Sequence, residues 1–138
     1  MTDSFGRAIT YLRVSATELC NLRCQYCMPA EGVCKRSHAD MLTEEELLRA
    51  VRIAAQLGVT KVRVTGGEPL LQAEFVEEFF ARLHEHGVHT ALDTSGVGNL
   101  SKAEKVLAHT DLVLCDLKFL TKADYLKNCR ADFDQIER

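Results

Sequence analysis

Hydrophobic and polar positions alternate along the chain with two different periods, which predicts strands and helices in turn. Residues 61–65 (KVRVT) alternate with a period of two, the pattern of a strand with one buried face. Residues 73–86 instead show the spacing of an amphipathic helix, which Gly87 ends. The apolar stripe of this helix consists of Phe75, Val76, Phe79, Phe80 and Leu83. On the same reasoning we expect strands at residues 9–15, 61–65, 88–93 and 112–117, and helices at residues 43–58, 73–86, 101 onward and 122–129.

Two of the expected helices begin with the residue pair of a capping box. Thr43 is followed three positions later by Glu46, and Ser101 is followed in the same way by Glu104. In this motif the hydroxyl accepts a hydrogen bond from the helix backbone, and the glutamate carboxylate accepts one from the N–H of the capping residue. We therefore expect Thr43 and Ser101 to be N-caps, with Gly58 as the stop of the first helix.

The order of these elements is strand then helix, repeated through four units. Such an order implies right-handed crossovers and a parallel sheet, and therefore an α/β fold. In parallel sheets and barrels, functional groups gather at the carboxyl ends of the strands. Four βα units make only part of a (β/α) barrel, so we expect residues 1–138 to form a single partial domain, truncated before the barrel is complete.

Composition narrows the class of protein. Of the 138 residues, 46% are hydrophobic and 27% charged, which is typical of a soluble globular chain. The net charge of −3 gives no reason to expect a nucleic-acid partner. No apolar run has the length of a membrane span, and residues 1–7 lack a signal-peptide pattern. We therefore expect a cytoplasmic protein without a membrane partner, in which thiols stay reduced and cysteines serve as metal ligands or buried side chains.

Three of the six cysteines stand close together directly after the first expected strand. Cys20, Cys24 and Cys27 have C-x3-C-x2-C spacing. Thiolates are the usual ligands of iron–sulfur clusters, and three of them leave the fourth iron of a [4Fe–4S] cluster open to a cofactor or substrate. The alternative is a structural zinc site with Cys34 as the fourth ligand. Cys115, on an apolar strand, is expected to be a small buried residue.

The other expected strands also end in residues whose chemistry suits ligand binding or catalysis. Gly66-Gly67-Glu68-Pro69 follows the second strand, and its glycines permit close approach of the backbone to a ligand. Asp93 and Thr94 end the third strand, while Asp116 and Lys118 end the fourth. Carboxylates on adjacent strand ends repel each other unless a cation or donor lies between them. The alternative for residues 93–95 is capping of the following helix.

The cysteine segment carries a family resemblance. The run Cys20-Asn-Leu-Arg-Cys24-Gln-Tyr26-Cys27 resembles the signature of the radical S-adenosylmethionine (SAM) superfamily. The resemblance implies a [4Fe–4S] cluster whose open iron is chelated by SAM. One electron then cleaves SAM to methionine and a 5′-deoxyadenosyl radical, which abstracts hydrogen. It also implies that Tyr26 lies near the adenine and that the Gly66-Gly67-Glu68-Pro69 segment binds the SAM amino group.

Residues 3–71 resemble the molybdenum-cofactor biosynthesis protein A family, the GTP 3′,8-cyclases. The resemblance implies that the substrate triphosphate contacts Arg13, Lys61 and Arg63. Lys61 and Arg63 are two apart on a strand and therefore share one face; the alternative is that this face is solvated. The motifs that carry the resemblance are Tyr11-Leu-Arg13-Val-Ser15, Cys27-Met-Pro29-Ala-Glu-Gly-Val and Val62-Arg63-Val-Thr-Gly-Gly-Glu-Pro-Leu.

Residues 72–138 resemble a different branch, the pyruvate formate-lyase activating enzymes, which act on glycyl-radical enzymes. The resemblance implies that Asp93, Thr94 and Asp116 help to bind a monovalent cation beside the SAM carboxylate, with Lys118 nearby. The family resemblance switches near residues 66–72, a segment that both families share. The motifs are Gln72-Ala-Glu-Phe-Val, His89-Thr-Ala-Leu-Asp93-Thr-Ser-Gly and Thr110-Asp-Leu-Val-Leu-Cys-Asp-Leu-Lys118.

We therefore expect a radical SAM enzyme, and we favour the GTP-cyclase-like step of molybdenum cofactor biosynthesis. Its partners would be GTP and an electron donor such as flavodoxin or ferredoxin. One alternative is a glycyl-radical enzyme activase, whose partner is a protein. Another is an inactive fragment that only binds a cluster, because an unclosed parallel sheet leaves an edge exposed.

Overall fold

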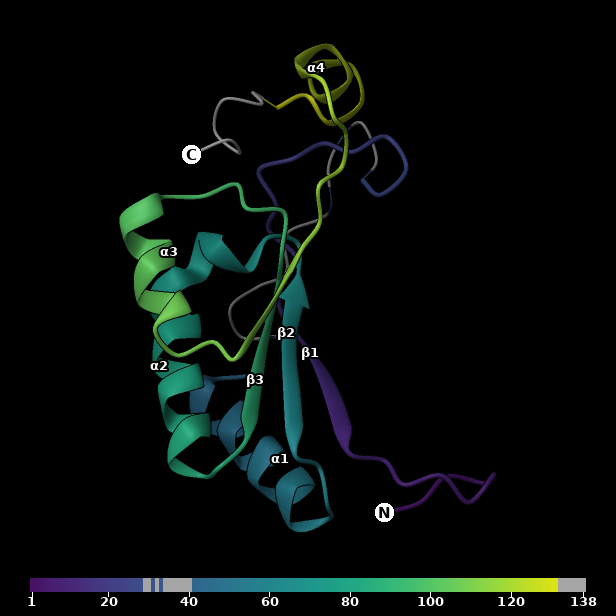
Figure 1. Cartoon of the computed structure of the whole chain (residues 1–138), viewed down its shortest axis with the longest axis vertical. Coiled ribbons are helices and arrows are strands. Elements are labelled where there is room, and N and C mark those ends of the chain that lie inside the picture. The colour runs from purple at the N-terminus through teal and green to yellow at the C-terminus, as the bar shows by residue number, and fades with distance from the viewer. Residues whose placement is uncertain (29–30, 32, 34–40, 132–138) are drawn as a thin grey trace.

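A computed structural model describes residues 1–28, 31, 33 and 41–131 (Figure 1). Four parallel strands form one sheet in the order β1-β2-β3-β4, and helices connect them along the chain. The strands are β1 (Tyr11–Thr17), β2 (Lys61–Gly66), β3 (His89–Thr94) and β4 (Leu112–Cys115). The helices are α1 (Glu44–Gln56), the 3-10 turn η2 (Pro69–Gln72), α2 (Ala73–Glu85), α3 (Leu100–Leu107) and α4 (Lys122–Cys129). The expected α/β class, parallel sheet and partial barrel are confirmed.

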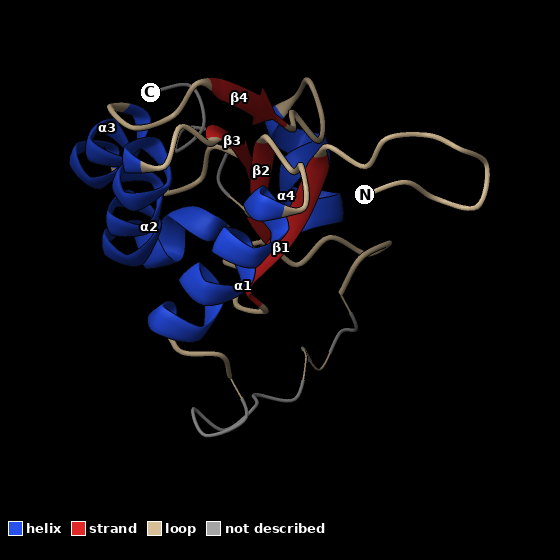
Figure 2. Cartoon of the chain, turned by 90° about the horizontal axis from the view of Figure 1, so that it is seen from below, coloured by secondary structure: helices blue, strands red, loops and turns tan. Residues whose placement is uncertain are grey.

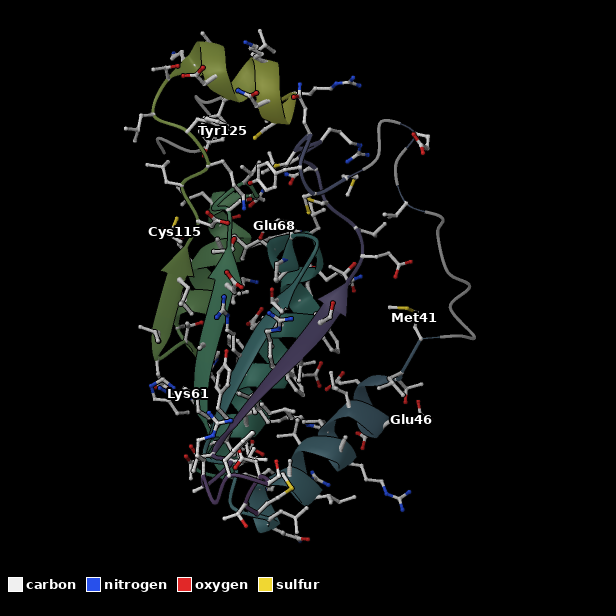
Figure 3. All side chains as sticks on the ribbon, turned by 90° about the vertical axis from the view of Figure 1, so that its right-hand side faces the viewer. Met41, Glu46, Lys61, Glu68, Cys115 and Tyr125 are labelled. Atoms are coloured by element: carbon white, nitrogen blue, oxygen red, sulfur yellow. The ribbon has the colours of Figure 1, made fainter. Side chains whose placement is uncertain are left out.

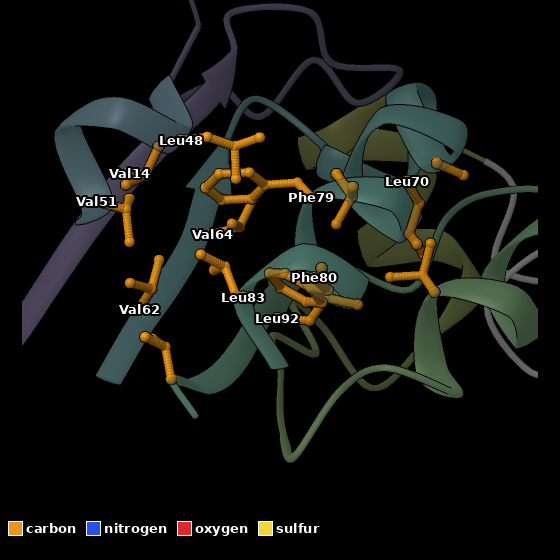
Figure 4. Packing of buried hydrophobic residues seen from close by; sticks show 14 residues of the cluster. Val14, Leu48, Val51, Val62, Val64, Leu70, Phe79, Phe80, Leu83 and Leu92 are labelled. Carbon is orange, nitrogen blue, oxygen red and sulfur yellow. The ribbon is translucent and has the colours of Figure 1, made fainter. Parts of the chain in front are cut away.

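One face of the sheet is covered by α1, α2 and α3 (Figures 1 and 2). Alternate side chains of the strands point to this face, among them Val62 and Val64 of β2, which are fully buried. They pack against the stripe of α2, where Phe79 and Phe80 are also fully buried (Figure 4). The predicted stripe is confirmed, with Phe75 at its half-buried margin. On β1 and β2 the residues between the apolar ones make the opposite face of the sheet polar. We call this side the polar face, although Ala91 of β3 and Leu112 and Leu114 of β4 also point to it.

Of the two predicted capping boxes, the one at α1 is present and the one at α3 is not. At α1 the box is present, because the Thr43 hydroxyl accepts from the Glu46 N–H and the Glu46 carboxylate accepts from the Thr43 N–H at 2.8 Å. At α3 the prediction is wrong. Asn99 is the N-cap, and its side chain accepts from the Lys102 N–H at 3.2 Å. Asparagine is as strong a cap as serine and stands earlier in the chain, so Ser101 falls inside the helix.

The fourth strand is shorter and more exposed than expected. β4 ends at Cys115 rather than at residue 117, and Leu112 and Val113 are 43% and 44% exposed. The expected burial of Cys115 is wrong, since its side chain is exposed. The physical reason is position, because β4 is the last strand of the described sheet and lacks a second strand to cover it.

Helix α4 lies beyond the carboxyl ends of the strands rather than against the helix-covered face (Figure 1). There it forms a second, smaller core with the cysteine segment, built from Leu22, Cys24, Val97, Tyr125 and Cys129. Tyr125 and Cys129 are fully buried in this second core. In the described part of the chain, no helix combines the length and apolar character needed to span a membrane.

Candidate cofactor site

A cavity of 130 Å³ lies where the four strands end. It brings together predicted residues from four separate parts of the sequence, as the parallel topology requires. They are Cys20, Cys24 and Cys27 after β1, Gly66 at the end of β2 and Gly67 directly after it, Asp93 and Thr94 of β3, and Asp116 and Lys118 after β4. Of the predicted cofactor-binding residues, Tyr26, Glu68 and Pro69 lie outside this lining.

The start of the cysteine segment is held against the end of β2 by backbone contacts. The Gly67 N–H donates to the Thr17 carbonyl at 2.7 Å, and the Glu68 N–H donates to the Leu19 carbonyl at 2.8 Å. A Cβ on Gly67 would lie only 2.0 Å from the Leu19 oxygen, and one on Gly66 would lie 2.3 Å from the Thr17 oxygen. Both glycines are therefore required for the two segments to approach.

The middle of the cysteine segment is held by the end of α4. The Arg23 N–H donates to the Cys129 carbonyl at 2.7 Å, and the Gln25 N–H donates to the Asn128 carbonyl at 3.0 Å. The last carbonyls of a helix have no partner within the helix, so the cysteine segment supplies the donors that α4 lacks. The buried Tyr125 extends this support, because its hydroxyl accepts from the Lys118 N–H at 2.9 Å.

The three predicted ligands differ in exposure. Cys24 is buried, Cys20 is half-buried and Cys27 is exposed. Burial raises the pKa of the Cys20 thiol, and the charge of Glu68 raises it as well. The Leu22 N–H, which donates to the Cys20 Sγ at 3.4 Å, lowers this pKa. The Sγ of Cys24 lies 3.4 Å from the Sγ of Cys129. Burial also raises the pKa of Cys129 to about 12, with Cys24 as the second cause.

This donor set fits a [4Fe–4S] cluster. Three thiols line one cavity, and a cluster takes each ligand on a different iron, so the sulfur atoms need not meet at one point. Among the described residues, no three His, Cys, Asp or Glu side chains converge closely enough to hold a single metal ion. Cys34, the fourth ligand of the zinc alternative, lies outside the described residues, as do Pro29, Ala30 and Gly32 of the predicted cyclase motif.

Glu68 connects the ends of two strands from inside the protein (Figure 3). Its side chain is fully buried and accepts four hydrogen bonds. Oε1 accepts from the Thr94 hydroxyl at 2.6 Å and the Leu70 N–H at 3.1 Å; Oε2 accepts from the Ser95 hydroxyl at 2.6 Å and its N–H at 2.8 Å. The carboxylate therefore holds Thr94 in the cavity wall, while the backbone of Gly66 and Gly67 borders the cavity. Pro69 is buried at the start of η2.

The strand-end carboxylates are each paired with a basic side chain. Asp93 Oδ2 accepts from Arg63 Nη2 at 2.5 Å and Nε at 3.0 Å, and from the Thr65 hydroxyl at 3.0 Å. Hydrogen bonding to Asp93 raises the pKa of Arg63. Asp116 is paired with Lys118. Burial lowers the pKa of Lys118, but Asp116 and, to a smaller extent, Tyr26 together raise it by more, so the net shift is upward. The side chains of Arg63 and Lys118 therefore relieve the repulsion expected between the two carboxylates. Binding of a monovalent cation at this place stays a prediction.

The remaining residues of the predicted site lie beside the cavity. The Tyr26 ring is exposed, with Lys118 Nζ 5.9 Å from its centroid. The alternative that residues 93–95 cap the next helix is wrong, because Asn99 caps α3. The Thr94 hydroxyl instead accepts from the Gly96 N–H at 3.0 Å, which closes a turn.

The three predicted triphosphate contacts share the polar face of the sheet. Arg13 of β1 is the register partner of Arg63 of β2, so their side chains point to the same side. Lys61 and Arg63 border a second cavity of 430 Å³ with Tyr11 and Leu114. Arg63 therefore lies between the two cavities. It borders the second cavity, and it donates hydrogen bonds to Asp93, which lines the first.

Sequence reasoning missed Thr65, Ser95 and Cys129. The period-two pattern of residues 61–65 could have found Thr65, because it shares a face with Arg63. Ser95 binds Glu68 through a contact between segments 27 positions apart, and Cys129 meets Cys24 across 105 positions. Neither contact produces a pattern in the neighbouring sequence from which it could be predicted.

Comparisons with known proteins agree with this geometry. The chain is 53% identical over 104 residues to molybdenum cofactor biosynthesis protein 1 of Mus musculus, covering 74% of this chain and 16% of that protein. It is 56% identical over 77 residues to a GTP 3′,8-cyclase of Alkaliphilus oremlandii, covering 56% of this chain and 24% of that one. The first match is longer than segment 3–71 and so extends into the second half. The expected cyclase resemblance is confirmed, while the activase resemblance of residues 72–138 stays a prediction.

Solved structures and a family model complete the comparison. Streptococcus suis SuiB bound to S-adenosylmethionine has a TM-score of 0.72 at 19% identity, covering 91% of this chain and 29% of that one, which shows a shared fold. The chain spans between a sixth and a quarter of the length of the two curated relatives above. The model of the radical SAM superfamily matches residues 14–138. The chain therefore belongs to the radical SAM superfamily, which implies a [4Fe–4S] cluster and SAM as its cofactors.

Proposed function

We propose that this chain carries the SAM-cleaving part of an enzyme that acts on a guanine nucleotide, as GTP 3′,8-cyclases do. The observation that carries the proposal is the single cavity shared by three cysteines and the ends of the other three strands. The names of the relatives support the substrate, and so does the basic face beside that cavity.

In this proposal, the residues on each side of the cavity have a different role. Cys20, Cys24 and Cys27 hold the cluster, which when bound supplies the electron that cleaves SAM. The backbone of Gly66 and Gly67 borders the cavity and offers its polar atoms to the amino acid end of SAM, while the space of the missing Cβ atoms is filled by the backbone of Thr17 and Leu19. On the β3 and β4 side, Thr94 and the Asp116–Lys118 pair offer polar atoms to the charged end of SAM.

The polar face of the sheet binds the triphosphate. Lys61 and Arg63 are half-buried, and basic groups in that position are costly unless an anion compensates them. Asp93 compensates Arg63 in part, which leaves Lys61 and Arg13 to receive the phosphates. Arg63 thus connects substrate and cofactor sides, since its partner Asp93 lines the first cavity.

The experiment begins with anaerobic cluster reconstitution of the chain. Iron and sulfide are quantified, and 5′-deoxyadenosine formed from SAM is measured with dithionite or flavodoxin as electron donor. We expect about four irons per chain and product formation, both lost in Cys24→Ser. Cys115→Ser is the matched control, because Cys115 is exposed and lies outside the cavity lining. Zinc without iron after anaerobic purification would contradict the proposal.

The substrate is tested separately by binding of GTP to the reconstituted chain. Lys61→Ala is expected to weaken binding at least tenfold, whereas Lys105→Ala on the exposed side of α3 is expected to leave it unchanged. Because Lys61 does not line the SAM cavity, cleavage of SAM should persist in this variant.

A glycyl-radical enzyme activase is the second candidate function. The gathering of Asp93, Thr94 and Asp116 on one cavity favours it. It predicts SAM cleavage that is stimulated by K⁺ or Na⁺ and no binding of GTP. Tight GTP binding without a monovalent cation effect would exclude it.

A further inference from the structure

The small core between the cysteine segment and α4 contains two thiols in direct contact. Sγ of Cys24 and Sγ of Cys129 are 3.4 Å apart, although the residues are separated by 105 positions in the sequence. Cys24 is 5% exposed and Cys129 is fully buried. The proposed function uses Cys24 as a cluster ligand and gives Cys129 no role.

The contact is fixed by backbone hydrogen bonds on both sides of Cys24. Arg23 N–H donates to the carbonyl of Cys129, and Gln25 N–H donates to that of Asn128. The Gln25 side chain adds a third bond, from Nε2 to the Lys127 carbonyl at 3.0 Å. The two thiols are therefore adjacent because their backbones are aligned, and not through the rotation of one side chain alone.

The geometry suits a covalent bond. A disulfide has an S–S distance of about 2.05 Å, so the two sulfur atoms, now 3.4 Å apart, need to approach by only about 1.3 Å. The surrounding side chains are mainly apolar, with Leu22, Val97 and Tyr125 in the same core. A disulfide is compatible with such surroundings because it carries no charge and has no hydrogen bond to satisfy.

We infer that Cys24 and Cys129 form a disulfide in the cluster-free chain, and that this bond blocks cluster loading until it is reduced. The blocking step rests on the proposed function, because it requires Cys24 as a ligand; the bond itself does not. Oxidation by a peroxide is balanced in two steps. The Cys24 sulfur attacks the peroxide and becomes a sulfenic acid with release of one water, and the Cys129 thiol then displaces a second water to form the S–S bond.

The inference gives Cys129 a function that depends on the state of the site. With the cluster bound, the Cys24 sulfur is coordinated and the pair does not form. After the cluster is lost, the two thiols give up two electrons and two protons to the peroxide. The disulfide then protects Cys24 from further oxidation and keeps the cysteine segment attached to α4, and a thiol reductant restores the ligand.

The bond is tested on the cluster-free chain without SAM. The chain is treated with one equivalent of hydrogen peroxide, alkylated and digested with trypsin, which releases residues 24–35 and residues 128–130 as separate peptides. We expect mass spectrometry to find these two peptides linked, and fragmentation to assign the bond to Cys24 rather than to Cys27 or Cys34. A link to Cys20, Cys27 or Cys34, or no link at all, would overturn the inference.

The block is tested by iron uptake after the same treatment. Oxidised wild-type chain is expected to take up less than a tenth of the iron that reduced chain takes up, with recovery after dithiothreitol. Cys129→Ser and Cys129→Ala should load iron like wild type before oxidation and should give no linked peptide after it, because the Cys24 sulfenic acid then has no thiol beside it in the small core. Cys115→Ser should behave like wild type in both measurements. If reduced wild type binds no iron, the proposed function fails while the linked peptides still establish the disulfide. If linked wild type loads iron normally, the block is wrong.

Discussion

The helix-covered face of the sheet and the carboxyl ends of its strands are stabilised in different ways. The covered face is held by many apolar contacts among periodic residues, such as Val62 and Val64 against Phe79 and Phe80. The strand ends are held by a few specific polar and backbone contacts between distant segments, with Glu68 at their centre. Many interchangeable contacts give stability, whereas a few directional ones determine where the thiols and carboxylates of the site lie.

The largest effect is expected from opening the apolar core. Phe79→Ala removes a fully buried ring and should lower the free energy of unfolding by about 3–5 kcal/mol, because the lost burial is joined by a cavity. Urea denaturation followed by circular dichroism measures the loss. Leu126→Ala on α4 is the control, since that side chain is 68% exposed and should change stability little. Equal losses in the two variants would show that the covered face does not dominate stability.

Substitution of Glu68 is expected to separate the two regions. Glu68→Gln keeps the shape but replaces one acceptor oxygen by an NH₂ group that faces donors, at a cost of about 2–3 kcal/mol. The loss should appear first at the strand ends, as faster hydrogen exchange of the Ser95 and Leu70 amides. Cluster uptake should fall with it, because Thr94 and the cavity wall are no longer held.

The matched control for this variant is Glu104→Gln, which changes an exposed carboxylate of α3. Amides in the middle of β2 should exchange at the wild-type rate in both variants. If Glu68→Gln accelerated exchange throughout the sheet, the strand ends and the covered face would form one cooperative unit.

This contrast also explains how much the sequence could predict. The α2 stripe is a local pattern, and it was found because the helical spacing of apolar residues determines which of them face a core. The gathering of Cys20, Gly66 and Asp93 was also predictable, because parallel strands place their carboxyl ends at one edge of a sheet.

What the sequence did not reveal are contacts between side chains of distant segments. Burial of Glu68 depends on Thr94 and Ser95 arriving from another strand, so the motif alone suggested a ligand-binding carboxylate rather than an internal connector. The exposure of Cys115 depends on β4 lying at the margin of the described sheet, and an apolar strand pattern does not encode that position.

The smallest effect is expected at the opposite end of the sheet, around Asp111. The Thr90 N–H donates to its carboxylate at 2.7 Å and holds the pKa of Asp111 below its usual value, with His84 contributing at 3.1 Å. A lowered folded-state pKa means stability that is present above the unfolded-state pKa of about 3.9 and is lost as the pH falls through the folded value. Asp111→Asn should therefore be less stable than wild type at pH 7 by under about 1 kcal/mol, because the side chain is 38% exposed and screened.

The measurement is thermal unfolding of both chains between pH 7 and pH 3, with Glu85→Gln at the exposed end of α2 as the control. The difference between wild type and Asp111→Asn should shrink as the pH falls below 4, since the wild-type carboxylate then becomes protonated in both states. A difference that stays constant with pH would mean that Asp111 acts through shape rather than charge. A growing difference would contradict the sign of the pKa shift. Iron uptake should be the same in all three chains, because the carboxylate lies at the end of the strands remote from the cysteines.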